Sequence, residues 1–179
     1  MFDLHQSRAY IFQKERPKIL RVDLSLCVGC QACVMACSLV KEGAFSPAKS
    51  RIWFHTDESR CLSIPTICEH CTDPPCIPVC PVNAITRDAI SGIVNIDEEA
   101  CTGCGECEDA CPFDSIRIRD EKALKCDLCG GDPECVKVCY PYALQYVEKQ
   151  PATIRNKLRL AKERLRALTS LNKGYVSEE

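Results

Sequence analysis

Sixteen of the seventeen cysteines fall into four groups of four, and these are the residues whose type and spacing could do chemistry. Groups one and three share the spacing C-x2-C-x2-C-x3-C, whereas the middle gap widens to four residues in group two and to five in group four. Because thiolates are soft ligands, the pattern indicates metal binding. The groups are Cys27, Cys30, Cys33 and Cys37; Cys68, Cys71, Cys76 and Cys80; Cys101, Cys104, Cys107 and Cys111; and Cys126, Cys129, Cys135 and Cys139.

The spacing within each group favours iron–sulfur clusters over other metal centres. Closely spaced cysteines can wrap one face of a cubane, and the fourth, beyond a three-residue gap, then reaches a second cluster. This run with a final proline is typical of bacterial two-cluster ferredoxins, and Pro81 and Pro112 supply the proline in groups two and three. Ser38 and Tyr140 stand at that position in groups one and four. We therefore predict four 4Fe–4S clusters.

Zinc is the alternative metal, in a structural or nucleic-acid-binding module of another class. An all-cysteine zinc site needs two C-x2-C pairs, whereas each group here supplies a triplet plus a distant fourth cysteine. Nucleic-acid binding also needs a basic face, but residues 1–150 carry 16 basic against 22 acidic side chains. Only residues 151–179 are basic, with 7 basic against 3 acidic side chains. We expect no nucleic-acid partner.

The cysteine count and the N-terminus indicate a reducing compartment. Of the 179 residues 17 are cysteine, and an odd number suits a disulfide framework poorly. The first residues lack the apolar segment of an export signal, and no run approaches the roughly 18 apolar residues of a membrane span. We therefore expect a cytoplasmic protein without a membrane span, whose thiols are kept for metal.

Short β-prone segments flank the cysteine groups and must position them. Ile19–Asp23 and Ile93–Asp97 lead into groups one and three, while Ser115–Arg119 and Ala143–Val147 follow groups three and four. We predict an α+β fold made of two-stranded pieces and one-turn helices. Such pieces bury little apolar surface, so bound clusters would contribute much of the folding free energy.

The residues around the cysteines resemble a known family. The chain is similar, over about residues 19–150, to the four-cluster ferredoxin-type electron-transfer subunits of dimethyl sulfoxide reductases, formate dehydrogenases and some hydrogenases. A narrower similarity is to the iron–sulfur partners of tungsten aldehyde oxidoreductases. The broad resemblance is carried by Ile67–Cys71, Asp73–Cys76, Val79–Ile85 and Cys101–Cys104, and the narrower one by Cys37–Leu39, Glu42, Gly43, Phe45, Pro47 and Ser50–Ile52.

The resemblance implies how the groups pair, which the spacing alone leaves open. Groups one and four would share a ferredoxin module at 19–60 plus 120–150, and groups two and three a second module at 61–119. An N-terminal extension at 1–18 and a basic amphipathic helix and tail at 151–179 would flank them. The implied cluster-binding sets are Cys27, Cys30, Cys33 and Cys139; Cys37, Cys126, Cys129 and Cys135; Cys68, Cys71, Cys76 and Cys111; and Cys80, Cys101, Cys104 and Cys107.

The resemblance also implies a non-catalytic electron-transfer subunit. Its partners would be a large catalytic subunit with a tungsten or molybdenum pterin, one that oxidises aldehydes, and a flavin subunit. We predict no catalytic residue, because no acid, base or nucleophile for a substrate accompanies the cysteines. A free-standing polyferredoxin is the alternative within the same chemistry.

Several residues outside the groups have open roles. Cys61 fits a buried small residue better than a ligand, and His70 fits a hydrogen-bonding residue beside a cluster. Trp53 and Phe54 serve either core packing or a partner contact. In the predicted tail helix at 152–170 an apolar stripe fits packing on the chain's own body, docking to a partner, or self-association. That stripe is Ile154, Leu158, Ala161, Leu165 and Leu168.

Overall fold

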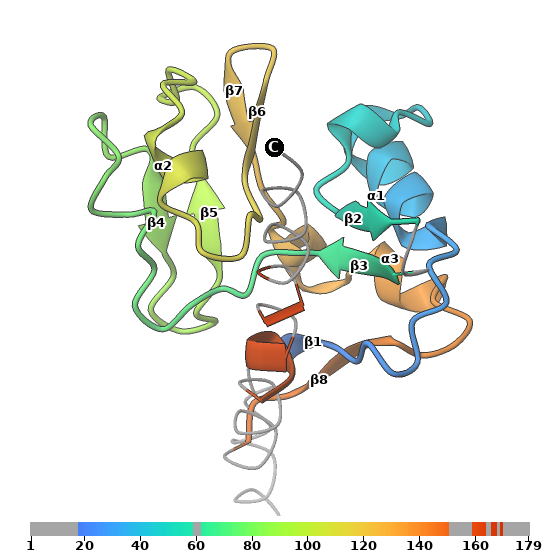
Figure 1. Cartoon of the computed structure of the whole chain (residues 1–179). Helices are drawn as coiled ribbons and strands as arrows, with labels where there is room; N and C mark the ends of the chain where they lie inside the picture. Colours follow the sequence, from blue (N-terminus) through green and yellow to red (C-terminus); the bar gives the residue numbers. More distant parts are fainter. Residues whose placement is uncertain (1–17, 59–61, 151–158, 164–165, 168, 170–179) are drawn as a thin grey trace, which may run out of the picture.

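The computed structural model describes residues 18–58, 62–150, 159–163, 166–167 and 169. Short strands, short helices and long loops alternate along the chain (Figure 1). The extension at 1–17, Cys61 and most of the predicted tail helix lie outside the described residues. The elements are β1 (Lys18–Val22), α1 (Ala32–Glu42), η2 (Pro47–Lys49), β2 (Trp53–Asp57), β3 (Leu62–Thr66), β4 (Ile85–Arg87), β5 (Val94–Ile96), α2 (Glu106–Asp109), β6 (Arg117–Arg119), β7 (Lys122–Leu124), η3 (Leu128–Gly131), α3 (Glu134–Lys137) and β8 (Leu144–Glu148).

The described strands form four separate two-stranded antiparallel sheets. The four runs expected to be strands contribute to β1, β5, β6 and β8, so these predictions are confirmed. Helices α2 and α3 have four residues each, the expected single turn. The 11-residue α1 is longer than expected. The α+β character therefore follows from short elements whose pairing leaves long connecting loops.

A first lobe forms where the two ends of the described body meet. Strand β1 pairs with β8, from Lys18 opposite Glu148 to Val22 opposite Leu144, and α1 packs against α3. Figure 1 shows this lobe with blue segments beside orange ones, because it combines early and late parts of the chain. Its buried residues are Leu20, Val22, Cys33, Val34, Cys37, Ile52, Ile67, Cys126, Leu128, Cys135 and Leu144.

A second lobe is built from the middle of the chain. Strand β4 pairs with β5, and β6 pairs with β7, which places the two small sheets around groups two and three (Figure 1). Its buried residues are Cys76, Ile85, Val94, Cys107, Ile116 and Ala123. Cysteines are thus part of both cores, so the same side chains contribute to apolar packing and carry the sulfurs.

Two hairpins cross the predicted domain boundaries. The β2–β3 hairpin spans the boundary at 60/61, and the β6–β7 hairpin spans the one at 119/120. Each boundary would therefore divide a two-stranded sheet. The boundaries stay a prediction.

The β2–β3 hairpin joins the two lobes through polar contacts. The indole Nε1 of Trp53 donates to the carbonyl of Asp114 at 2.8 Å, and His55 Nε2 pairs with the Asp114 carboxylate at 2.7 Å. Arg117 lies over the Trp53 ring at 5.1 Å from its centroid. Phe54, from the opposite face of the strand, packs on the first core. The structure thus places both aromatic residues in intramolecular packing.

The described part of the tail has helical backbone at residues 159–163, 166, 167 and 169. Leu160 and Ala161 are buried, and Arg159 forms an ion pair with Glu163 at 2.6 Å. The helix as a whole stays a prediction, because the rest of it lies outside the described residues. No helix in the described ranges is long and apolar enough to cross a lipid bilayer.

The hydrogen bond of Trp53 predicts a loss of stability in the variant Trp53→Phe. This change keeps an aromatic ring but leaves the Asp114 carbonyl without its indole donor. We expect a cost of about 1 kcal/mol, seen as a fall of about 2–4 °C in the midpoint of thermal bleaching of the visible absorption. Tyr140→Phe is the control, since Tyr140 is 90% exposed. Equal midpoints for the two variants would show that Trp53 does not join the lobes.

Candidate iron–sulfur sites

Sets A to D are the four predicted ligand sets, and the structure brings the members of A and D around two hollows. Phe54 and Leu144 also line the hollow at set A, and Ile85 and Ile118 also line the hollow at set D. Set A is Cys27, Cys30, Cys33 and Cys139, set B is Cys37, Cys126, Cys129 and Cys135, set C is Cys68, Cys71, Cys76 and Cys111, and set D is Cys80, Cys101, Cys104 and Cys107.

Within set B, and likewise within set C, the cysteines lie close enough for the charge on one sulfur to change the pKa of another. After burial, negative charge on Cys126, Cys37, Cys33 and Cys129 raises the pKa of Cys135. Likewise, after burial, charge on Cys68 and on Cys111 raises the pKa of Cys76. Sulfurs from groups far apart in the sequence thus share the same surroundings.

The donor sets fit a multi-atom inorganic group. All sixteen grouped cysteines lie in the described part of the chain, and each is a free thiol. Among the described residues no three His, Cys, Asp or Glu side chains close on one point as the ligands of a single ion do. The hollow at set D is lined by all four of its cysteines, and the hollow at set A by all four of its own. Four thiols that surround one hollow are the donor set that a 4Fe–4S cluster takes.

A left-handed residue shapes the first turn of every cysteine group. It stands two positions after the first cysteine, with φ 67° at Gly29, 47° at His70, 67° at Gly103 and 58° at Leu128. This conformation turns the backbone N–H toward the preceding sulfur: His70 N lies 3.4 Å from Cys68 Sγ, and Leu128 N lies 3.4 Å from Cys126 Sγ. The loop thus offers hydrogen bonds that favour negative charge on sulfur.

A second N–H donor reaches the last cysteine of each group. In groups two, three and four it comes from a tight turn just after the cysteine, as in Ala84 N to Cys80 Sγ and Ser115 N to Cys111 Sγ, both at 3.3 Å. Leu144 N serves Cys139 in the same way, at 3.3 Å. A proline stands directly after the cysteine in groups two and three, and one residue later, as Pro141, in group four, so a helix cannot continue past any of these three cysteines.

Group one obtains this donor from a distant residue. Ser38 stands where a proline would end the helix, so α1 continues to Glu42 and the tight turn is missing. Arg51 N, fourteen residues after Cys37, donates to its sulfur at 3.3 Å instead. The buried Ser38 hydroxyl accepts from Ser46 N at 3.1 Å and so holds the segment that brings Arg51 back. Group one has no proline within the two residues after its last cysteine, so the helix continues and the donor comes from Arg51 instead.

Burial is the main cause of the raised thiol pKa values. It raises the pKa of Cys33 and Cys126 to about 12 and that of Cys76 and Cys107 to about 11. The Lys125 ammonium opposes the rise at Cys76 and Cys126. A desolvated thiolate needs compensating positive charge, which iron bound to sulfur would supply.

Three polar residues lie near the sulfurs, and the sequence predicted the role of only one of them. His70 is confirmed as a hydrogen-bonding residue, since its Nδ1 accepts from Val94 N at 3.0 Å. The sequence did not predict a role for Arg51 or Lys125, both buried beside cysteines of the predicted ligand sets. The signal for Lys125 is its position directly before Cys126, whereas nothing local marks Arg51.

Comparisons with known proteins find 4Fe–4S domains in this chain. A family described as a 4Fe–4S dicluster domain matches residues 59–150, and one described as a 4Fe–4S binding domain matches residues 24–41. The aliphatic sulfonate oxidoreductase, polyferredoxin-like subunit of Pyrococcus furiosus is 41% identical over 116 residues, which are 64% of this chain and 66% of that protein. Formate hydrogenlyase subunit 2 of Escherichia coli is 33% identical over 70% of this chain and 79% of that protein.

Coverage differs among further matches. The chain spans between 21% and 54% of three other curated relatives. A chain in the solved active-site complex BamBC of benzoyl coenzyme A reductase is 27% identical over 79% of this chain and 86% of that chain, with a TM-score of 0.43.

The left-handed turns predict that Gly103→Ala damages set D. A Cβ at Gly103 would overlap the backbone carbonyl of Glu121, which cannot rotate away, in addition to the strain of φ 67°. Gly43→Ala is the control, because Gly43 has φ 68° and no described heavy atom within 4 Å of the new Cβ. We expect Gly43→Ala to cost about 1–2 kcal/mol through conformation alone, and Gly103→Ala clearly more, together with lost iron. Thermal bleaching and iron analysis measure both, and equal effects would contradict the overlap.

Proposed function

The chain belongs to the 4Fe–4S dicluster family, and from this premise we propose that it is an electron-transfer subunit holding four 4Fe–4S clusters. A 4Fe–4S cluster supplies one-electron redox chemistry. The sixteen cysteines of sets A to D would be the iron ligands. The two hollows at sets A and D and the repeated N–H donors to sulfur support this assignment.

The observation that carries the proposal is the order of the sets. Cys33 of set A and Cys135 of set B lie in the first core, and Lys125 Nζ contacts both the sulfur of Cys68 in set C and the carbonyl of Cys126 in set B. Sets C and D share the second core. The order A, B, C, D therefore runs from one lobe into the other.

Exposure of the sulfurs follows the same order. Of the sixteen grouped cysteines, all described, only Cys30 of set A and Cys104 of set D are exposed. Set B has three buried members, Cys37, Cys126 and Cys135. Two accessible ends and a shielded middle are what a relay between two redox partners needs.

The second part of the proposal concerns the redox partners of the chain. We propose a large catalytic subunit with a tungsten or molybdenum pterin, oxidising aldehydes, and a flavin subunit at the other end. Support comes from the resemblance around Cys37–Ile52 and from the name of the Pyrococcus furiosus relative, a subunit of an oxidoreductase. The chain itself would be non-catalytic and cytoplasmic.

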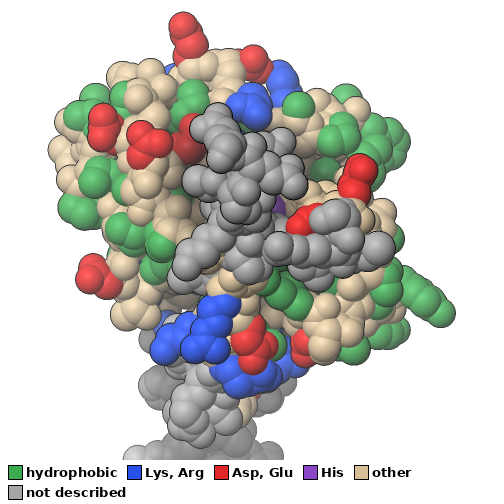
Figure 2. All heavy atoms as spheres, viewed as in Figure 1, with side chains coloured by type: hydrophobic (Ala, Val, Ile, Leu, Met, Phe, Trp, Pro, Cys, Tyr) green, Lys and Arg blue, Asp and Glu red, His purple; other side chains and the backbone are tan. Residues whose placement is uncertain are grey.

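Surface charge supports docking to a basic partner surface. On the face shown in Figure 2, Asp and Glu side chains are spread over the described body, and a group of Lys and Arg side chains lies along its lower edge. Loaded clusters would add negative charge to the acidic body, which favours a basic counterpart. Self-association through the basic tail at 151–179 is part of the proposal, but that segment lies mostly outside the described residues.

Iron content and one cysteine substitution test the ligand assignment. We expect about 16 iron atoms per chain in the wild type and about 12 in Cys104→Ser, together with interrupted electron transfer between isolated partners. Cys61→Ser is the matched control, because Cys61 is the cysteine outside the groups, and it should keep all iron. Zinc without iron, or unchanged electron transfer in Cys104→Ser, would overturn the proposal.

Anaerobic affinity purification of the tagged chain from its native host tests the partners. We expect a large subunit to copurify, with tungsten or molybdenum found by metal analysis of the eluate. Iron in the chain with no copurifying protein would favour a free-standing polyferredoxin. A large partner containing neither metal would contradict the pterin enzyme while keeping the electron-transfer role.

A further inference from the structure

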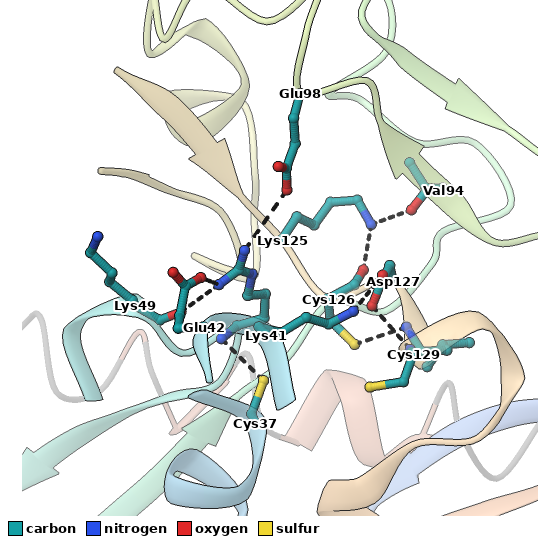
Figure 3. Close-up of polar contacts among 12 residues, drawn as sticks. Cys37, Lys41, Glu42, Lys49, Val94, Glu98, Lys125, Cys126, Asp127 and Cys129 are labelled. Carbon is teal, nitrogen blue, oxygen red and sulfur yellow. Dashed lines mark hydrogen bonds and ion pairs between the residues drawn. The ribbon is translucent and has the colours of Figure 1, made fainter. Parts of the chain in front are cut away.

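Lys125 lies at the junction of the lobes, between a cysteine of set B and one of set C. Its side chain is buried, with the residue 7% exposed. The Nζ atom donates to the carbonyl of Cys126 at 2.7 Å, to the carbonyl of Val94, and to Cys68 Sγ at 3.5 Å. Figure 3 shows the ammonium between the Val94 and Cys126 carbonyls. An ammonium has three donors, and here each finds an acceptor.

We propose that Lys125 is a positioning residue whose buried ammonium raises the reduction potential of the cluster bound by set C. The inference rests on the proposed function, because it assumes that set C holds a 4Fe–4S cluster. The Cys68 sulfur is the member of set C that Lys125 touches. At set B it touches only a main-chain carbonyl, so the effect there is smaller.

The neighbouring cations differ from Lys125 in how they are compensated. Lys41 pairs with Asp127 at 2.6 Å, and Arg51 pairs with Glu42 and, at 3.8 Å, with Glu98. Lys41, Arg51 and Lys125 line one hollow between the lobes, together with Asp127 and Glu98. In the described part of the chain no carboxylate forms an ion pair with Lys125, whose acceptors are two carbonyls and one sulfur.

Because of this difference, Lys125 is the nearby cation whose charge most affects the reduction potential of the cluster on set C. A buried charge is costly unless opposite charge lies near it. Reduction adds one electron to the group on set C, with no bond formed or broken, and so brings negative charge toward the ammonium. The reduced state is therefore favoured, and removal of the ammonium lowers the potential.

The test is an anaerobic potentiometric titration of the full iron-loaded chain, with dithionite and mediators and detection by electron paramagnetic resonance. Cys71→Ser identifies the signal of set C by altering it. In Lys125→Met we expect the ratio of reduced to oxidised cluster at set C to fall at least about tenfold at a fixed solution potential, which is 59 mV for a one-electron couple. The signals of sets A and D should stay in place.

Two further variants separate charge from packing. Lys125→Arg keeps the charge and should stay close to the wild-type potential, whereas Lys125→Gln keeps donors without charge and should behave like Lys125→Met. Lys49→Met removes the same charge from a side chain that is 43% exposed, where solvent screens it, so we expect less than a twofold change. If Lys125→Met does not load iron, the comparison of Arg with Gln decides.

The outcomes distinguish this inference from the proposed function. If Lys125→Met, or Lys125→Gln in its place, loads four clusters and keeps the wild-type ratio within twofold, Lys125 only joins the lobes and the inference is wrong. A lower thermal midpoint without a change of potential leads to the same conclusion. If the wild type holds no 4Fe–4S cluster, the proposed function fails first, and iron analysis shows this before any titration.

Discussion

Each predicted ligand set draws three sulfurs from one cysteine group and the fourth from another, and the rest of the structure depends on this crossing. Set A joins Cys139 to group one, and set B joins Cys37 to group four, although about a hundred residues separate these groups. The β1–β8 pairing and the α1–α3 contact hold the two segments together in the first lobe. The part of the chain between these two segments in the sequence forms the second lobe.

The backbone, more than any side chain, prepares the sulfurs for negative charge. Left-handed residues turn an N–H toward the first cysteine of a group, and a second N–H reaches the last cysteine. Burial alone would keep these thiols protonated, as the raised pKa of Cys33 to about 12 illustrates. Hydrogen bonds and iron together would offset that desolvation. The short strands serve mainly to hold these loops at the required positions.

The junction between the lobes combines packing with electrostatics. Trp53 and His55 fasten the β2–β3 hairpin to Asp114, three residues after Cys111 of set C. Arg51 contacts the sulfur of Cys37 through its backbone N–H and Glu98 of the second lobe through its guanidinium, and Lys125 contacts Cys68 of group two and Cys126 of group four. The contacts that fix the order of the four sets therefore also place charge beside the two inner sets.

Local patterns in the sequence predicted both the cluster chemistry and the short strands. Cysteine spacing identified the four groups, and alternating apolar residues located β1, β5, β6 and β8, because both are patterns of near neighbours along the chain. The folded chain was needed to see that Arg51 N donates to the sulfur of Cys37 and that Lys125 contacts the sulfur of Cys68. Contacts of this kind join residues 14 to more than 100 positions apart, as in Arg51 with Cys37 and Cys139 with Cys27. Spacing within a group carries no information about them, because they depend on how whole lobes pack.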